Sequence, residues 1–468
     1  MIFTEIKDFF TIFGAPVFLP IVIFIICKAL KMDTKKSFLS GLYAGVGLQG
    51  FMLLIGAFTP IIMPVIKQMI ASTGINLPVL DLGWQTTAII AYSSKIGLIF
   101  FAFAIIIQLV LFATRFTNIF LPSDLWLNYT YMVWGAMVYI ATKSFTLAML
   151  FMIIILLFSI LNFEVICKSW SKYYKYPNCT IISTHNTEPT ILLYILDPLF
   201  NKLGLNKVKL NPENMKEKMG IFGEPGTIGL FLGILIGILG NINRLNSMEA
   251  WGQITKLGIV LAALLIIFPK ISEIFGKAFA PMAEIMNKKL ENDTKEEKSK
   301  KREWYIGVDD ATGYGEPATL ITGTILIPII ILMALILPGN KTLPMVDLVA
   351  LPFMVEAVIA MTRGNILKTT IVCGIWYSLG LYMCTAIAPI YTQCAIDAGI
   401  ALPAGALMIT SFNMMAQPVV GILFLGFITK NPFIIGGIII LYFVMLFIVK
   451  KYKVRIHNHI DKMAEKNA

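Results

Sequence analysis

The chain has 468 residues, of which 57% are apolar and 14% charged, and its net charge is +11. An ordinary soluble domain has roughly 45–50% apolar and 25% charged residues, so this composition excludes a purely soluble protein. A helix that spans a bilayer needs about 20 mostly apolar residues. In chain order, segments of this kind lie at about residues 9–28, 39–58, 88–113, 131–163, 221–240, 257–275, 318–337, 346–361, 369–389, 401–428 and 432–449.

These segments predict an all-α polytopic membrane protein with about 9–11 transmembrane helices, some of them re-entrant or broken at Gly and Pro. Glycines crowd one helix face in residues 40–56 (SGLYAGVGLQGFMLLIG) and again in 223–237 (GEPGTIGLFLGILIG). Close helix packing explains most of this likeness, but transporters often contain inverted repeats as well. We therefore expect a single transmembrane domain, residues 1–468, built as an inverted repeat with approximate halves 1–205 and 221–456.

Basic residues cluster at three places along the chain. The segment KALKMDTKK (28–36) has four lysines, residues 287–303 form a charged loop, and residues 450–468 form a basic tail. Positively charged loops tend to stay in the cytoplasm. The three basic segments are therefore predicted to lie inside and the N-terminus outside. No small-residue cleavage site follows the first apolar segment, so we expect it to be retained. Loops that face an anionic leaflet explain the net charge, and no nucleic-acid partner is predicted.

Cysteine and histidine are too scattered to predict a metal site or another cofactor. The six cysteines form no close pair, and two of the three histidines lie in the basic tail. The neighbouring carboxylates Asp309 and Asp310 are a weak alternative as metal ligands, because adjacent acids are common on loops. The cysteines are expected to be small apolar packing residues.

Glu-Pro occurs three times at the start of an apolar segment, with Glu188, Glu224 and Glu316. Proline is favoured in the first turn of a helix, so each pair predicts a helix start near which the glutamate meets free backbone N–H groups. A glutamate at such a place is either an ordinary cap or part of a binding site. For Glu224, which follows a polar basic loop, the two interpretations are equally good.

The flanks of the other two glutamates favour a binding site for hydroxyl groups. Carboxylates accept hydrogen bonds from diols, and Asn and neutral His both donate and accept. Irregular backbone at membrane depth survives where it lines a cavity, and acids at that depth are costly and usually functional. GVDDATGYGEPATLITG (307–323) has no Lys or Arg, so a neutral sugar or polyol suits the site better than an anion. The residues expected to line it are His185, Asn186, Thr187, Glu188, Asp309, Asp310, Glu316 and Thr319.

Longer stretches resemble a known family of transport proteins. They are LPIVIFIICKALKM, FLSGLYAGVGLQGFMLLIG, INLPVLDLGW (75–84), FGEPGTIGLFLGILIGIL, WYIGVDDATGYGEPATLITGTILIPIIILMALILPGNKTLPMVDL (304–348) and RGNILKT (363–369). In these stretches the chain resembles the membrane-embedded IIC component of bacterial phosphotransferase systems (PTS), in the ascorbate–galactitol group and nearest to its galactitol permeases. The last two stretches are the most specific.

The resemblance implies a homodimer in the bacterial inner membrane, each protomer having a substrate-holding core and a dimerising scaffold. It implies uptake of galactitol or a related polyol, which is phosphorylated as it arrives inside. The phosphoryl group would come from a cysteine of a separate IIB protein, charged from phosphoenolpyruvate through enzyme I, HPr and IIA. The chain itself would then be a transport subunit that carries no phosphoryl group.

Matched residue by residue, the resemblance places His185 and Asp309 on a histidine and an aspartate of the family. It also places Asp81, Gly83 and Trp84 on an Asp-Val-Gly-Trp stretch, which adds the neighbouring Gln85, and Thr392 with Gln393 on a Thr-Gln pair. Thr130 and Glu316 stand where the family member has histidines, and Thr187-Glu188-Pro189-Thr190 has no clear counterpart. These departures leave the exact substrate open.

Two other functions fit the composition. An ion-coupled secondary transporter of neutral solutes would need an intramembrane carboxylate as proton carrier, for which Glu356 or Glu316 qualifies. A lipid-linked glycosyl or prenyl transferase would need paired acids and nearby basic residues, and the Asp309–Asp310 stretch lacks nearby cations. Dependence of uptake on phosphoenolpyruvate, and not on the proton gradient, separates the phosphotransferase reading from the secondary transporter.

Overall fold

The computed structural model describes residues 15–29, 31–72, 77–121, 125–205, 208, 210–291, 303–403 and 406–467. The helices of the first part are α2 (Ala15–Ala29), α3 (Thr34–Ala71), α4 (Trp84–Ser93), α5 (Lys95–Ala113), α6 (Leu125–Thr142), α7 (Phe145–Tyr174), α8 (Thr184–Thr187), α9 (Pro189–Lys202) and α10 (Pro212–Met219). Those of the second part are α11 (Pro225–Gly240), α12 (Met248–Glu291), α14 (Ala311–Tyr314), α15 (Pro317–Ile336), α16 (Leu351–Thr362), α17 (Ile366–Asp397), α18 (Phe412–Met415), α19 (Pro418–Ile428) and α20 (Pro432–Asn467). Three 3₁₀ turns join them: η2 (Gly220–Gly223), η3 (Ile242–Arg244) and η4 (Val346–Ala350).

The all-α membrane fold is confirmed. Within the described residues, seven helices are long and apolar enough to cross a bilayer, and Pro225–Gly240 and Pro418–Ile428 are shorter apolar helices. Together with these two shorter helices, the described residues contain nine possible spans, which is the lower end of the predicted 9–11. Several helices are interrupted, as expected: α4 and α5 meet at Ser94, whose side chain accepts a hydrogen bond from the backbone N–H of Gly97.

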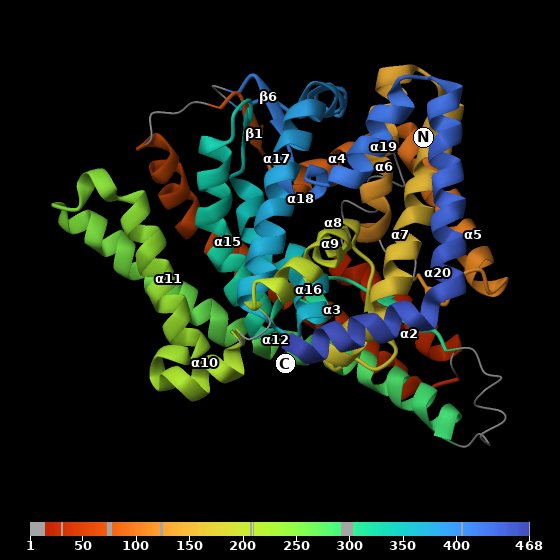
Figure 1. Ribbon diagram of the computed structural model, residues 1–468, viewed down its shortest axis with the longest axis horizontal. Coiled ribbons are helices and arrows are strands. Elements are labelled where there is room, and N and C mark those ends of the chain that lie inside the picture. The colour runs from red at the N-terminus through yellow and green to blue at the C-terminus, as the bar shows by residue number, and fades with distance from the viewer. Residues whose placement is uncertain are drawn as a thin grey trace.

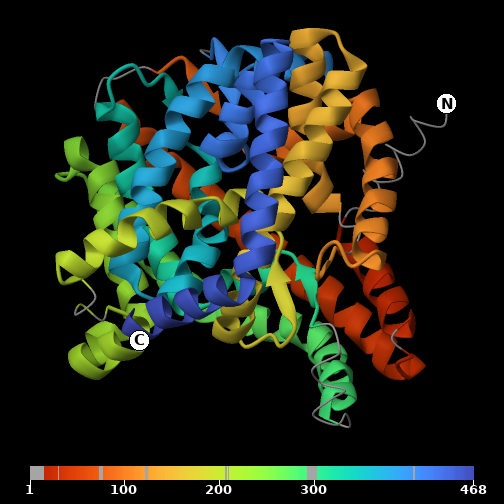
Figure 2. The same cartoon turned by 45° about the vertical axis from the view of Figure 1, so that its right-hand side comes forward.

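Six short strands form two parallel three-stranded sheets, which the sequence analysis missed. The strands are β1 (Val79–Asp81), β2 (Ile119–Phe120), β3 (Cys179–Ile181), β4 (Tyr305–Val308), β5 (Thr342–Leu343) and β6 (Met408–Thr410). One sheet has the order β5-β1-β6 and the other β2-β4-β3. Figure 1 shows β1 and β6 at the top of the molecule, and Figure 2 shows the other sheet near its lower end.

The order of elements supports the predicted inverted repeat. From α2 to α9 and from α11 to α19, each half has two helices, a strand, a broken helix, a second strand, two helices, a third strand, and a short helix followed by a longer one. The central strand of each sheet is the first strand of one half, and its neighbours are the second and third strands of the other half. The halves thus exchange strands.

The two similar glycine-rich stretches, which suggested the repeat, do not lie in equivalent helices of the two halves. Residues 40–56 lie in α3 and residues 225–237 of the second stretch lie in α11, but by element order α11 corresponds to α2. The glycines of α11 have another role, because α11 packs tightly on α12: a Cβ added at Gly233 would lie 2.6 Å from the carbonyl oxygen of Leu257. Close helix packing is therefore what this pattern encodes.

The basic tail is part of the folded structure. Helix α20 bends at Tyr452, and its last part lies along the lower end of the molecule in Figure 1. Ile460 and Met463 are buried there, and Lys168 forms an ion pair with Asp461 at 3.2 Å. The predicted basic tail over 450–468 is thus helical up to Asn467, and part of it packs against the rest of the protein. Of the predicted charged loop 287–303, residues 292–302 lie outside the described residues, and 287–291 belong to α12.

Candidate functional site

The centre of the predicted site is a contact between the two halves of the chain. Strands β3 and β4 are parallel, so the residues that follow them emerge at the same edge of the sheet. There the Nε2 atom of His185 lies 2.9 Å from Oδ2 of Asp310, and the Ser183 hydroxyl donates to the same oxygen at 3.0 Å. His185 is buried, and its Nδ1 atom has no hydrogen-bond partner among the described residues. One ring nitrogen is therefore buried without a hydrogen-bond partner in the part of the chain that the structure describes.

Two neighbours of His185 are engaged by the protein itself. The Asn186 side chain donates to the carbonyl of Phe353 and accepts from the N–H of Ala357 at 2.7 Å, so it fastens α8 to α16. The Thr187 hydroxyl donates to the carbonyl oxygen of Thr184 at 3.3 Å. Asn186 therefore holds α8, and with it His185, against α16, whereas the Thr187 bond lies within α8.

Glu188 caps a helix of the other half. Its carboxylate accepts hydrogen bonds from the backbone N–H groups of Val419 and Val420, at 3.2 and 3.0 Å, at the start of α19. A carboxylate stabilises a helix start in this way. The helix start predicted from Glu188-Pro189 is correct, because Pro189 begins α9, but the glutamate serves α19 instead of its own helix.

Glu316 is both a cap and a cavity residue. Its Oε2 atom accepts from the backbone N–H and the hydroxyl of Thr319, both at 2.8 Å, which caps α15. Its Oε1 atom accepts from the Tyr173 hydroxyl at 2.8 Å, and the Thr319 hydroxyl lies 2.8 Å from that of Tyr174. Glu224 also occupies an N-cap position, but its side chain makes no capping hydrogen bond and pairs with Lys216 at 2.9 Å.

The cavity beside Glu316 has a volume of about 580 Å³, and we call it the Arg363 cavity. It is lined by Lys172, Tyr173, Tyr174, Lys175, Tyr176, Asn211, Pro212, Glu213, Pro269, Glu273, Thr312, Gly315, Glu316, Pro317, Ala360 and Arg363. The expectation of a site without arginine is wrong for this cavity. The cations come from the ends of α7 and α16, which are distant in sequence from the Glu316 stretch.

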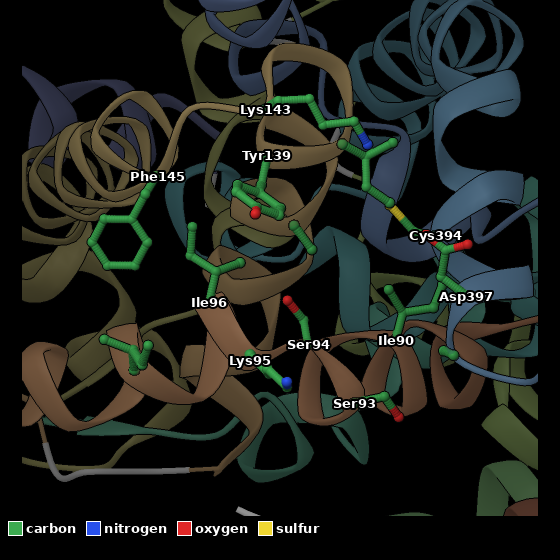
Figure 3. Close-up of a pocket in the computed structure, with 14 residues that line it drawn as sticks. Ile90, Ser93, Ser94, Lys95, Ile96, Tyr139, Lys143, Phe145, Cys394 and Asp397 are labelled. Atoms are coloured by element: carbon green, nitrogen blue, oxygen red, sulfur yellow. The ribbon is translucent and has the colours of Figure 1, made fainter.

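A second cavity, of about 340 Å³, lies where α4 and α5 meet, and we call it the Lys143 cavity. It is lined by Ile90, Ser93, Ser94, Lys95, Ile96, Ile99, Ala136, Tyr139, Ile140, Lys143, Phe145, Cys394, Asp397 and Ala398. Figure 3 shows Lys143 and Tyr139 on one side of this space and Ser94 on the other.

The remaining predicted residues do not join the His185–Asp310 contact. Gln85 is exposed in the first turn of α4. The Thr392 hydroxyl accepts from the backbone N–H of Ile409 at 2.9 Å and so ties α17 to β6. Gln393 is exposed and donates to Asp397, a residue of the Lys143 cavity, at 2.8 Å. Asp309 lies next to Asp310, and its carboxylate accepts from the N–H of Ala311 at 2.8 Å.

Two further residues were singled out for other reasons. Thr130, which the resemblance places on a histidine of the family member, is buried, and its hydroxyl lies 3.6 Å from the sulfur of Met414 in α18. Glu356 is fully buried; one carboxylate oxygen accepts from the Trp170 indole at 3.3 Å, and the other has no partner among the described residues.

Two buried carboxylates at the edge of the other sheet have a role that was not predicted. Asp81 accepts four backbone N–H groups, and Asp347 accepts two backbone N–H groups and a hydroxyl. Both follow Leu-Pro-X-X, in LPVLD (77–81) and LPMVD (343–347). This repeated motif was the available signal.

The cysteines lie in settings that disfavour the thiolate. All six are buried and unpaired. Cys179, in β3, is the cysteine nearest in sequence to His185, and burial raises the pKa of its thiol to about 12. In the part of the chain that the structure describes, no three His, Cys, Asp or Glu side chains are grouped so that they could hold a metal ion.

Comparison with known proteins gives a consistent result. The family model for the PTS system sugar-specific permease component, EIIC-GAT, matches residues 8–405. The galactitol-specific EIIC component of the PTS from Escherichia coli K12 is 30% identical over 444 residues, which cover 94% of this chain and 95% of that protein. The same component of E. coli O157:H7 matches equally, and a putative permease IIC component of E. coli K12 is 26% identical over 425 residues, 90% of this chain and 94% of that protein.

Proposed function

Since the chain belongs to the EIIC-GAT family of sugar-specific permeases, it is a membrane-embedded IIC transport subunit of a phosphotransferase system, and we propose that it takes up galactitol or a related polyol. The galactitol-specific relatives support this substrate. So does the chemistry of His185 and Asp310, which can accept hydrogen bonds from hydroxyl groups.

We place the polyol at the contact between His185 and Asp310. In the tautomer that carries its proton on Nε2 and donates it to Asp310, Nδ1 is an acceptor. A polyol hydroxyl would then donate to Nδ1, and Asp310 has acceptor capacity for a second hydroxyl. Because His185 follows β3 and Asp310 follows β4, the ligand would bridge the two halves. This pairing is the observation that carries the proposed site.

Because the chain belongs to this family, it cooperates with a IIB protein and the rest of the phosphotransferase cascade. We further propose that the Arg363 cavity faces the cytoplasm, where IIB would reach the polyol. The positive-inside tendency supports this orientation, because Lys172, Lys175 and the basic part of α20 lie at this end. Within one chain, helices α2, α3, α11 and α12 pack on one another. In the homodimer implied by the resemblance, this group of helices would contact the same group of the second copy.

The test is uptake of labelled galactitol by membrane vesicles that contain the protein together with its IIA, IIB, HPr and enzyme I. We expect galactitol phosphate to accumulate in the presence of phosphoenolpyruvate, with no effect of an uncoupler of the proton gradient. A His185→Ala protein should lose most of this activity, whereas Lys430→Asn, a change on an exposed loop, should retain it. Accumulation of unmodified galactitol that stops with the uncoupler would support the secondary transporter instead, with Glu356 as the proton carrier.

A further inference from the structure

The Lys143 and Arg363 cavities occupy equivalent places in the two halves. Lys143 ends α6 and Arg363 ends α16, and both have a left-handed backbone, with φ of 57° and 49°. Each cavity also contains the junction of two consecutive helices, α4 and α5 at Ser94 and α14 and α15 at Glu316. The Ser94 side chain caps α5, and the Glu316 side chain caps α15. The last turns of α17 and α7 complete the two cavities.

The two cavities lie at opposite ends of the same two helices. Helix α7 starts next to Lys143 and ends in the Arg363 cavity, whereas α17 starts next to Arg363 and ends in the Lys143 cavity. With 30 and 32 residues and a rise of about 1.5 Å per residue, these helices are roughly 45 Å long. A bilayer with its headgroups is about 40–45 Å thick. The cavities therefore open toward opposite sides of the membrane.

The Lys143 cavity has the chemistry of a site for hydroxyl groups. The Ser93 hydroxyl is buried and has no hydrogen-bond partner among the described residues. Tyr139, Lys143 and Asp397 add donors and an acceptor, and Gln393, which the resemblance singled out, donates to Asp397. Isoleucines form the rest of the wall, as in small-molecule sites, where a few polar groups are set in an apolar lining.

We propose that the Lys143 cavity is an outer binding site where the neutral polyol docks before it reaches His185 and Asp310. This inference rests on the proposed function, because it takes the polyol as the ligand. The Arg363 cavity is then its counterpart on the cytoplasmic side. The Thr312 hydroxyl matches Ser93 in the outer cavity, since it is also buried without a partner in the described part of the chain. Gln393 and Glu316 were predicted to belong to one site, but they lie at different cavities. Gln393 would serve the outer end of the polyol's path across the membrane, and Glu316 the cytoplasmic end.

The experiment compares the two sides of the membrane. Right-side-out vesicles measure the KM of uptake, and inverted vesicles with added IIB measure phosphorylation of polyol supplied from the cytoplasmic side. Lys143→Asn and Asp397→Asn should raise the uptake KM roughly three- to tenfold, the loss expected for one hydrogen bond. Neither should change phosphorylation in inverted vesicles. Asn tolerates the left-handed backbone of Lys143.

The matched control is Lys430→Asn, which removes an exposed lysine of the same backbone conformation (φ 56°) outside the cavity and should leave the uptake KM unchanged. An unchanged uptake KM in both cavity variants overturns the proposal, as does an equal change on both sides. If Lys143→Asn instead removes a co-purified phospholipid and leaves the KM unchanged, the cavity holds a lipid headgroup and the proposal is wrong. Absence of galactitol phosphorylation by the unmodified protein would contradict the proposed function, which is a distinguishable result.

Discussion

The Asp81 carboxylate accepts the backbone N–H of Asp347 at 2.7 Å, across 266 residues of chain. The same carboxylate accepts the N–H groups of Gly83, Met345 and Phe412, each at 3.0 Å. A fully buried carboxylate thus joins the residues that follow three parallel strands. This arrangement explains how an acid without a nearby cation is held inside an apolar protein, since each N–H group satisfies a carboxyl oxygen that is shielded from water.

Replacing Asp81 by Asn should destabilise the protein. Each carboxylate oxygen accepts two N–H groups, and an amide keeps only one acceptor oxygen. Two buried N–H groups therefore lose their partner, at a cost of about 1–3 kcal/mol each. The expected result is a lower melting temperature of the purified protein in detergent, measured by tryptophan fluorescence. Asp397→Asn, at an exposed position, is the control and should leave the melting temperature nearly unchanged. An unaltered melting temperature for Asp81→Asn would contradict this role.

The His185–Asp310 contact should be measurable as a coupling energy in polyol binding. Galactitol affinity is measured for His185→Ala, Asp310→Asn and the double variant. Residues that act in one hydrogen-bonded network typically couple by about 0.5–3 kcal/mol, so the effects of the single variants should not add. Strictly additive losses, or affinities equal to that of the unmodified protein, would remove these two residues from the proposed site.

Replacing Glu316 by Gln should affect both stability and binding. The carboxylate caps α15 through Thr319, and losing a cap costs about 0.5–2 kcal/mol of stability. Losing charge-assisted hydrogen bonds to polyol hydroxyls should cost roughly 1–3 kcal/mol, about five- to 150-fold in affinity. Glu224→Gln is the control, because Glu224 makes no capping bond. A lower melting temperature with unchanged galactitol affinity would show that Glu316 is a cap alone.

The orientation can be tested at the two equivalent helix ends. Lys143→Cys should react with a membrane-impermeant maleimide in intact cells, and Arg363→Cys should react only after the cells are opened. The six natural cysteines are buried, so the unmodified protein provides the background. Labelling of Arg363→Cys in intact cells would reverse the proposed topology.

The chain should carry no phosphoryl group during turnover. A reactive cysteine needs an accessible thiolate, whereas burial raises the pKa of the Cys179 thiol to about 12. We expect mass spectrometry of the protein, taken while phosphoenolpyruvate drives uptake, to find phosphocysteine on IIB and none on this chain. A Cys179→Ser protein should remain active. A stable phosphocysteine on this chain would contradict the prediction.

Features that depend on local sequence were predicted well. Apolar segments of sufficient length gave the membrane fold, and each Glu-Pro pair marks a true helix start, because Pro189, Pro225 and Pro317 begin α9, α11 and α15. These signals act over a few residues, since length decides spanning and the missing N–H of proline decides its place in the first turn.

Features that depend on contacts between distant segments were not predictable. The strands are only two to four residues long, too short for an alternating pattern to be recognised. Glu188 caps α19, a helix more than 200 residues later in the chain. Arg363 reaches the cavity beside Glu316 only because α16 ends there, so a stretch without cations in sequence was mistaken for a cavity without cations.

The exchange of strands has a consequence for synthesis and membrane insertion. Strands β2 and β3 flank β4, so they have no central partner until the ribosome has made residues 305–308. Until then, the backbone groups of β2 and β3 that bond to β4 lack these partners. Splitting the gene between residues 205 and 221 would give two fragments that form neither sheet alone. Co-expression of both fragments should restore a folded protein, because each supplies the middle strand that the other lacks.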